Sequence, residues 1–498
     1  MIPIGYAYVE PTTLTYVFVV LAVLLALAFE FVNGFHDTAN AVATVIYTNT
    51  LKATPAVVWS GIWNLIGVLT SSGLVAFSIV ALLPVELVLN IGSAAGFAMV
   101  FSLLISAISW NVGTWYLGLP ASSSHTLIGS ILGVGLANAL MGPGHSVTDG
   151  VNWAKAQDVM IGLLVSPVVG FCAAGLLLLL CKALVKNPSL YKAPVGKTPP
   201  PPWIRGILML TCTGVSFAHG SNDGQKGMGL IVLILIGILP GTYALRMNAD
   251  HADAKDVVAS AQALSTDLAP LTGGLQPDGK TAQDTLTNFI KHPKAPEAEV
   301  FASIKQMTDD LGSRLGAAKT MADIPPAQRG DIRTDLFLIS KTVEKLQKIG
   351  ALKDAGIEVS ATTLRKQADD ITNFIPDWVK YAVALALGLG TMIGYKRIVR
   401  TVGEKIGKDH LTYAQGGAAE LVAMCTILMA DHFGLPVSTT HVLSSGVAGT
   451  MAANKSGLQM ATVRNILLAW VLTLPVSIFL GALLFAFGLN LIALLGLG

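Results

Sequence analysis

This chain carries one pattern twice, as GLPASSSHTLIG at Gly118–Gly129 and as GLPVSTTHVLSS at Gly434–Ser445. Each copy has Gly-Leu-Pro, three adjacent hydroxyl side chains and a histidine, and the copies begin 316 residues apart. A second related pair precedes them, NGFHDTANAVA at Asn33–Ala43 and HGSNDGQKGMG at His219–Gly229. An aspartate motif followed by a hydroxyl motif therefore occurs twice, which indicates an internal duplication.

The spacing within each copy supports this duplication. Asp37 precedes Ser122 by 85 residues, whereas Asp223 precedes Ser438 by 215 residues. The excess of 130 residues is close to the length of a polar segment at about 246–374. Without that segment, both halves have the same order of motifs and apolar runs.

Composition places the duplicated unit in a membrane. Of the 498 residues, 53% are hydrophobic and 12% are charged, and the mean hydropathy is +0.63. Soluble domains carry about 25% charged residues. The apolar runs are long enough to span a bilayer, which takes about 20 residues; they lie at about 14–33, 56–83, 92–117, 159–181, 227–245, 376–394, 411–430 and 465–497. Because the runs are continuous rather than alternating, we expect an all-α polytopic membrane protein and no β-barrel.

The polar segment at 246–374 holds 16 of the 32 Lys and Arg and 18 of the 30 Asp and Glu. Its apolar residues recur three and four apart, which predicts a small soluble helical insert. The chain is therefore expected to divide into a first membrane repeat (1–181), a basic Pro-rich cytoplasmic linker (182–205), the start of a second repeat (206–245), the insert (246–374) and the rest of that repeat (375–498).

Basic loops predict the topology. Lys and Arg are concentrated in the linker 182–205 and in the loop 395–408, so both are expected on the cytoplasmic side. One broken span over about 206–241 then places the insert outside, in the periplasm. The two aspartate motifs face opposite ways, which predicts an inverted repeat with binding near the membrane midplane, as in transporters.

The hydroxyl motifs predict an anion site. Pro120 and Ser122 are typical of a helix start, so we expect a helix that begins inside the membrane with its hydroxyls at the N-terminal end. Free N–H groups and hydroxyls at such an end bind anions without arginine. Two converging copies suit a tetrahedral oxyanion, with these predicted ligands: Ser122, Ser123, Ser124, Ser438, Thr439 and Thr440. The alternative is that these side chains only satisfy helix ends or pack helices.

Asp37 and Asp223 are expected to be intramembrane carboxylates, which by default mark ion or proton paths. Asn40 follows Asp37 by three residues and shares its helical face. Carboxylate and amide oxygens suit Na⁺. The alternative is a pair of internally satisfied structural groups.

His125 and His441 follow the hydroxyls at the same offset, as a Ser–His nucleophilic pair of an intramembrane hydrolase would. No order of acid, histidine and serine supports that alternative. We expect instead that the histidines hydrogen-bond the motif backbone, and that the protein is not an enzyme.

GFHDTANAVA and GSNDGQKG resemble the two signatures of the inorganic phosphate transporter (Pit) family, and the two hydroxyl motifs resemble its other pair. The resemblance covers nearly the whole membrane part and is closest to the bacterial low-affinity branch. It implies about twelve membrane helices, including broken or re-entrant segments, in an inverted repeat that is often dimeric. It also implies phosphate ligands at the six hydroxyl residues and cation ligands at Asp37, Asn40 and Asp223.

Lys226 is a departure, because the family commonly has Asn three residues after the second signature aspartate. An ammonium group offers donors and no acceptor, so it cannot coordinate Na⁺. We therefore expect Lys226 to take the place of a bound cation beside Asp223, and coupling to protons. The alternatives are that Lys226 extends to the interface or contacts phosphate directly. The insert is also absent from many members.

These observations predict a symporter that imports inorganic phosphate, alone or as a metal–phosphate complex, by alternating access. H⁺ or Na⁺ supplies the gradient, and no cofactor is expected. The predicted setting is the bacterial inner membrane, as a homodimer, with no nucleic acid partner. A sulfate permease is the close alternative, although sulfate lacks a proton to donate to a carboxylate. A divalent-cation channel would need rings of acidic residues, and none is visible in the sequence.

Overall fold

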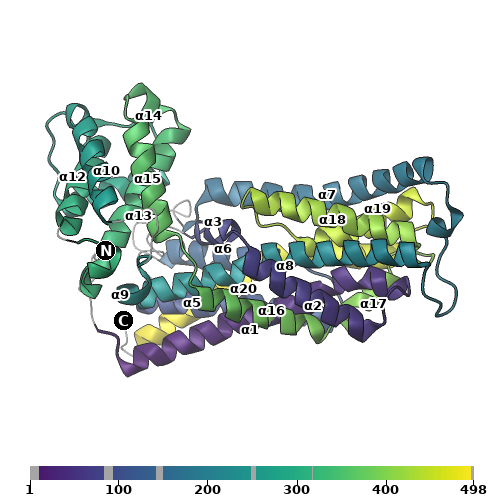
Figure 1. The fold of residues 1–498 in the computed structure, drawn as a ribbon. Coiled ribbons are helices and arrows are strands. Elements are labelled where there is room, and N and C mark those ends of the chain that lie inside the picture. The colour runs from purple at the N-terminus through teal and green to yellow at the C-terminus, as the bar shows by residue number, and fades with distance from the viewer. Residues whose placement is uncertain (1–9, 84–92, 142–149, 248–253, 317, 495–498) are drawn as a thin grey trace. The chain divides into compact units, whose positions relative to one another are not determined.

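The computed structural model of this chain consists of helices joined by loops (Figure 1). It describes residues 10–83, 93–141, 150–247, 254–316 and 318–494, with the backbone alone at 38–40. The described residues form two compact units. One is built mainly from Val232–Phe374, and the other from Val20–Pro84, Ala94–Ile231 and Ile375–Gly498.

The second of these units, called here the membrane unit, contains two comparable sets of helices. The first set is α1 (Thr13–Tyr47), α2 (Ala53–Thr70), α3 (Leu74–Val80), α5 (Ala94–Tyr116), α6 (Ser123–Met141) and α7 (Trp153–Leu184). The second set is α8 (Pro202–Ile238), α16 (Asp377–Met392), α17 (Lys396–Glu404), α18 (Tyr413–His432), α19 (Thr439–Ala453) and α20 (Met460–Leu494). The short helix η2 (Pro188–Tyr191) lies between them.

Seven described helices are long and apolar enough to cross a membrane, and the count is eight if α16 and α17, bent by 63°, form one span. The seven are α1, α2, α5, α6, α7, α18 and α20. Their outward apolar side chains stay exposed, among them Leu164, Leu176 and Phe479. In water such a surface would be costly, whereas in lipid it is the expected boundary. The protein is therefore a multi-pass membrane protein, as the composition predicts.

In the membrane unit, the helix that follows each hydroxyl motif packs against a helix of the other set. α6 packs against α20, and α19 packs against α7, so each hydroxyl helix contacts the last helix of the other set (Figure 1). Small residues permit the close approach: a Cβ on Gly133 would lie 2.0 Å from Ile478 O, and one on Gly449 would lie 2.0 Å from Phe171 O. Such small-residue contacts replace the hydrophobic effect as the packing force between membrane helices.

α1 and α8 run side by side in opposite directions. The start of α8 meets the end of α1, where Arg205 Nε donates to Thr50 O over 3.0 Å. Further along, Gly227 of α8 packs against Glu30 of α1. Since both helices carry an aspartate motif, the two motifs point opposite ways along the unit.

The broken span expected over 206–241 is wrong, because α8 is one continuous helix to Ile238. Its glycines would weaken an isolated helix. In the structure they let α2 approach instead: a Cβ on Gly220 would lie 2.1 Å from Asn64 O. The packing that glycine permits offsets its lower helix propensity.

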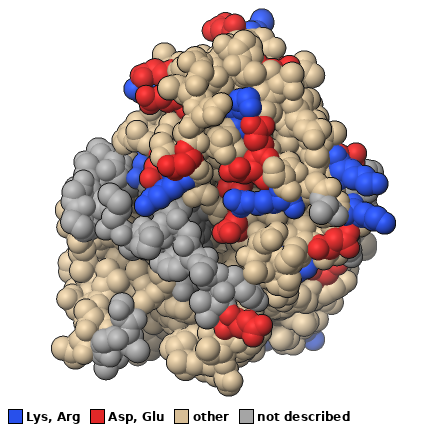
Figure 2. All heavy atoms as spheres, turned by 90° about the vertical axis from the view of Figure 1, so that its left-hand side faces the viewer, with Lys and Arg blue, Asp and Glu red and all other residues tan. Residues whose placement is uncertain are grey.

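The other unit is the helical insert, with its own apolar core. Its helices are α9 (Pro240–Tyr243), α10 (Ala254–Leu268), α11 (Gly279–Lys291), α12 (Ala298–Leu315), α13 (Pro326–Lys348), α14 (Ala351–Asp354) and α15 (Glu358–Thr372), with η3 (Ala269–Leu271) and η4 (Met321–Asp323). Leu264, Leu311 and Leu336 are fully buried in this core. On the face drawn in Figure 2, basic and acidic side chains are interspersed, as on a solvated surface.

Candidate functional site

Both hydroxyl motifs lie at the N-terminal ends of buried helices. α6 begins at Ser123 and α19 begins at Thr439. The Ser122 Oγ accepts from the backbone N of His125 at 3.2 Å, and the Ser438 Oγ accepts from that of His441 at 3.1 Å. These two serines cap their helices, which fits the helix starts that the sequence predicts.

The next hydroxyl in each motif reaches the aspartate of its own half. Ser123 Oγ donates to Asp37 Oδ2 over 2.6 Å, and Thr439 Oγ1 lies 3.4 Å from Asp223 Oδ2. Asp37 is 2% exposed and Asp223 is fully buried. The predicted anion ligands and the predicted carboxylates therefore belong to one cluster.

The third hydroxyl in each motif points toward the aspartate of the opposite half. Thr440 Oγ1 donates directly to Asp37 Oδ1. In the other motif, Lys226 lies between Ser124 and Asp223: its Nζ is 2.5 Å from Ser124 Oγ and 2.5 Å from Asp223 Oδ1. The Lys226 side chain is fully buried. The side chain of Asn40, its counterpart after Asp37, lies outside the described part of the structure.

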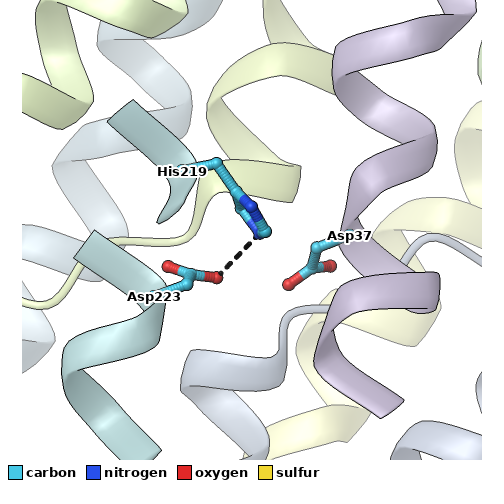
Figure 3. Close-up of side chains that lie close together, drawn as sticks. All are labelled: Asp37, His219 and Asp223. Carbon is cyan, nitrogen blue, oxygen red and sulfur yellow. Dashed lines mark ion pairs between the residues drawn. The ribbon is translucent and has the colours of Figure 1, made fainter. Parts of the chain in front are cut away.

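Each of the two aspartates has a histidine side chain beside it. His36 Nδ1 lies 3.1 Å from Asp37 Oδ1, and His219 Nε2 lies 3.3 Å from Asp223 Oδ2. In Figure 3 the His219 ring points toward the gap between the two carboxylates. One ligand atom each from Asp37, His219 and Asp223 lies within 4.8 Å of the others, so this group has the donors to hold a cation. The predicted cation ligand Asp223 thus gains an imidazole neighbour that the sequence did not single out as a ligand.

Within the described part of the chain, the His125 and His441 rings show no hydrogen bond to the motif backbone, contrary to expectation. Their backbone amides serve the caps, while the rings pack on each other with centroids 4.6 Å apart. Trp470 stacks on His441 at 4.0 Å, and its indole Nε1 donates to Pro120 O over 2.8 Å. Among the described residues, His125 Nδ1 and His441 Nε2 have no hydrogen-bond partner.

Several buried polar groups were missed from the sequence as parts of this cluster. Asn33 Oδ1 lies 2.8 Å from Ser123 Oγ, and Asn64 Oδ1 lies 2.8 Å from His219 Nδ1. Thr114 Oγ1 lies 3.1 Å from His36 Nε2. The available signal was a polar residue within an apolar run, which alone does not distinguish a packing group from a site group.

Glu420 forms a separate buried group on α18. It accepts from Thr211 Oγ1 at 2.5 Å and from the Thr44 hydroxyl. The carboxyl is fully buried, and both of its oxygens have partners. It therefore lies outside the cluster of the two motifs.

The family model described as the phosphate transporter family matches residues 33–481. This chain belongs to that family. Its members are transporters, so the family membership agrees with the expectation that the protein is not an enzyme. The match spans both aspartate motifs and both hydroxyl motifs.

Similar proteins in this family come from several bacteria. The chain is 44% identical to the low-affinity inorganic phosphate transporter PitB of Escherichia coli (strain K12), over 95% of this chain and 97% of that protein. It is 43% identical to PitA of the same organism, over 92% and 95%. The probable low-affinity inorganic phosphate transporter of Bacillus subtilis (strain 168) is 28% identical, over 95% and 97%.

A solved structure shares the fold. The sodium-dependent phosphate transporter superposes with a TM-score of 0.51 at 18% identity, covering 96% of this chain and 100% of that one. At this identity, the likeness concerns the arrangement of helices alone.

Proposed function

We propose that this protein is a secondary active transporter that imports inorganic phosphate, alone or as a metal–phosphate complex. The observation that carries the proposal is the meeting of two helix N-termini with two buried aspartates: Ser123 with Asp37 and Thr439 with Asp223. Helix ends supply N–H donors for the anion. The names of the similar proteins support phosphate as the substrate.

Phosphate binding is coupled to a bound positive charge because each hydroxyl group of the motifs can donate only one proton. A hydroxyl group has one proton to donate, and the hydroxyls of Ser123 and Thr440 donate theirs to Asp37. A proton or cation bound at or near Asp37 weakens the hold of that carboxylate on the two hydroxyl protons. The hydroxyls then turn to phosphate, so anion binding requires a bound positive charge.

We propose protons rather than Na⁺ as the coupling ion. Lys226 Nζ already lies 2.5 Å from Asp223 Oδ1 and offers no lone pair to a metal ion. One Na⁺ at Asp37 and Asn40 is the alternative. The divalent metal of a metal–phosphate complex would meet the donors of Asp37, His219 and Asp223.

The architecture proposed is an inverted repeat of about twelve membrane helices, with halves that rock around the central site. The opposite directions of α1 and α8 support it, as do the exchanged pairs α6 with α20 and α7 with α19. The domain boundaries expected from the sequence remain part of this proposal: 1–181, 182–205, 206–245, 246–374 and 375–498.

The setting proposed is the bacterial inner membrane, as a homodimer, with the insert in the periplasm. Support for the insert's side comes from the basic loops 182–205 and 395–408.

Uptake of radiolabelled phosphate into proteoliposomes tests the function. We expect accumulation that excess phosphate abolishes and excess sulfate does not. A hydrogen phosphate ion can donate its proton to Asp37 or Asp223, and sulfate cannot. Equal competition by sulfate would favour the alternative, a sulfate permease of the same fold.

A further inference from the structure

Glu30 is a buried carboxyl group that the proposed site does not use. It lies on α1, seven residues before Asp37, and is fully buried. Its Oε2 accepts from Asn33 Nδ2 over 3.3 Å. Its Oε1 has no hydrogen-bond partner among the described residues. A charged carboxylate with an unpaired oxygen is costly in a dry interior, whereas the neutral acid is much less so.

A chain of hydrogen bonds joins Glu30 to the hydroxyl motif. Asn33 donates to Glu30 through Nδ2, and its Oδ1 lies 2.8 Å from Ser123 Oγ, where it competes with Asp37 for the one hydroxyl proton. The same Ser123 Oγ lies 2.6 Å from Asp37 Oδ2. The protonation state of Glu30 therefore reaches Ser123 through one amide, since neighbouring hydrogen bonds polarise each other.

Among the described residues, Glu30 has no ion-pair partner of its own, and Lys226 and the Gly227 backbone N–H offset only part of the cost of its charge. The charged groups that face it from α8 are Asp223 and Lys226, which pair with each other over 2.5 Å. The part of α16 that packs on this level of α1, residues 387–391, contains no titratable side chain. Gly227 makes room for the carboxyl: a Cβ there would lie 2.3 Å from Glu30 Cγ and 2.6 Å from Oε1.

We propose that Glu30 is the binding site of the coupling proton, an inference that rests on the proposed phosphate transport. The proton adds to the Glu30 carboxylate from the outer side, forming an O–H group, and leaves as H⁺ on the inner side. Glu30 and Asp37 are two turns apart, about 10 Å along the helix. Removing one negative charge at that distance strengthens binding of an anion by roughly tenfold at an effective dielectric constant of about 20.

The experiment uses Glu30→Gln in proteoliposomes with two measurements. The first is exchange of labelled phosphate at equal phosphate and pH on both sides. The second is accumulation driven by an acid exterior, with a trapped dye reporting proton entry. Because glutamine mimics the protonated acid, we expect exchange within a few fold of wild type and loss of both accumulation and proton entry. Asp158→Asn, which neutralises an exposed carboxyl of α7, is the matched control and should accumulate normally.

Two results for Glu30→Gln would overturn the proposal, and one result for the wild-type protein would refute the proposed function. Accumulation by Glu30→Gln at the wild-type level would overturn it, and so would loss of exchange together with accumulation in a monodisperse protein. A wild-type protein that neither exchanges nor accumulates phosphate would refute the proposed function instead.

Gly227→Ala provides a second test that keeps the carboxyl. The added methyl group displaces Glu30 from its place, so proton-driven accumulation should fall while exchange persists. Gly206→Ala is the control on the same helix, because a Cβ there meets nothing within 4 Å. Unchanged accumulation by Gly227→Ala would contradict the assignment, even if Glu30→Gln were not recovered as folded protein.

Discussion

Replacing Lys226 by asparagine tests whether its ammonium group stands in for a transported cation. Lys226→Asn copies Asn40, the residue at the same offset in the first half. The ion pair with Asp223 is fully buried on both sides. Removing one partner of such a pair destabilises the folded arrangement of the site by about 3–5 kcal/mol. At 1.4 kcal/mol for each factor of ten, the equilibrium constant for that arrangement falls by a factor of about 100 or more. The variant should therefore be nearly inactive unless a cation from solution compensates Asp223.

An amide oxygen can coordinate Na⁺ whereas an ammonium group cannot. We therefore expect phosphate uptake by Lys226→Asn to depend on Na⁺, while wild-type uptake proceeds on a proton gradient without Na⁺. Lys226→Met has similar length and no oxygen, so Na⁺ should not restore it. Lys52→Asn, at an exposed lysine, should behave as wild type. The assay is initial uptake in proteoliposomes with Na⁺ replaced stepwise by an impermeant cation. Na⁺-independent uptake by Lys226→Asn at the wild-type rate would refute the reasoning, and a strict Na⁺ requirement of the wild type would make Lys226 a phosphate contact.

Three further predictions concern the site, the topology and the packing. Ser123→Ala and Thr439→Ala should each raise the phosphate concentration for half-maximal uptake several-fold, since one hydroxyl hydrogen bond contributes about 1 kcal/mol; unchanged uptake kinetics in both would remove these residues from the site. A cysteine at Asp309, in a background without the four native cysteines, should react with an impermeant maleimide in intact spheroplasts; labelling only after permeabilisation would place the insert inside. Gly133→Ala should lower the melting temperature of the purified protein, because its Cβ would lie 2.0 Å from Ile478 O, whereas Gly113→Ala meets nothing within 4 Å and should not; equal melting temperatures would contradict the role of Gly133 in packing.

The sequence predicted what depends on local order and repetition. Pro120 and Ser122 mark a helix start whether or not the rest of the chain is known, and the structure begins α6 at Ser123. It could not predict contacts that only packing creates. The chain from Glu30 through Asn33 to Ser123 joins α1 to α6, and Asn33 and Ser123 are 90 residues apart in the sequence.

The continuity of α8, which the sequence interpretation missed, also depends on packing. Gly220 and Gly227 have poor helix propensity. Their value is in tertiary contacts, with Asn64 of α2 and Glu30 of α1, which local sequence does not encode. Lys226 was predicted beside Asp223 because three residues are about one helical turn. Its second partner, Ser124, lies 102 residues away and became visible only in the structure.

The most direct test of the account is a crystal structure with bound arsenate, a tetrahedral phosphate analogue whose arsenic gives an anomalous signal. We predict one anomalous peak in the membrane unit between the N-terminal ends of α6 and α19, within hydrogen-bond distance of Ser123 and Thr439. The Ser123 hydroxyl should then donate to arsenate instead of to Asp37. A peak remote from both helix ends, with Ser123 still bonded to Asp37, would contradict the claim that the paired hydroxyl motifs form the anion site.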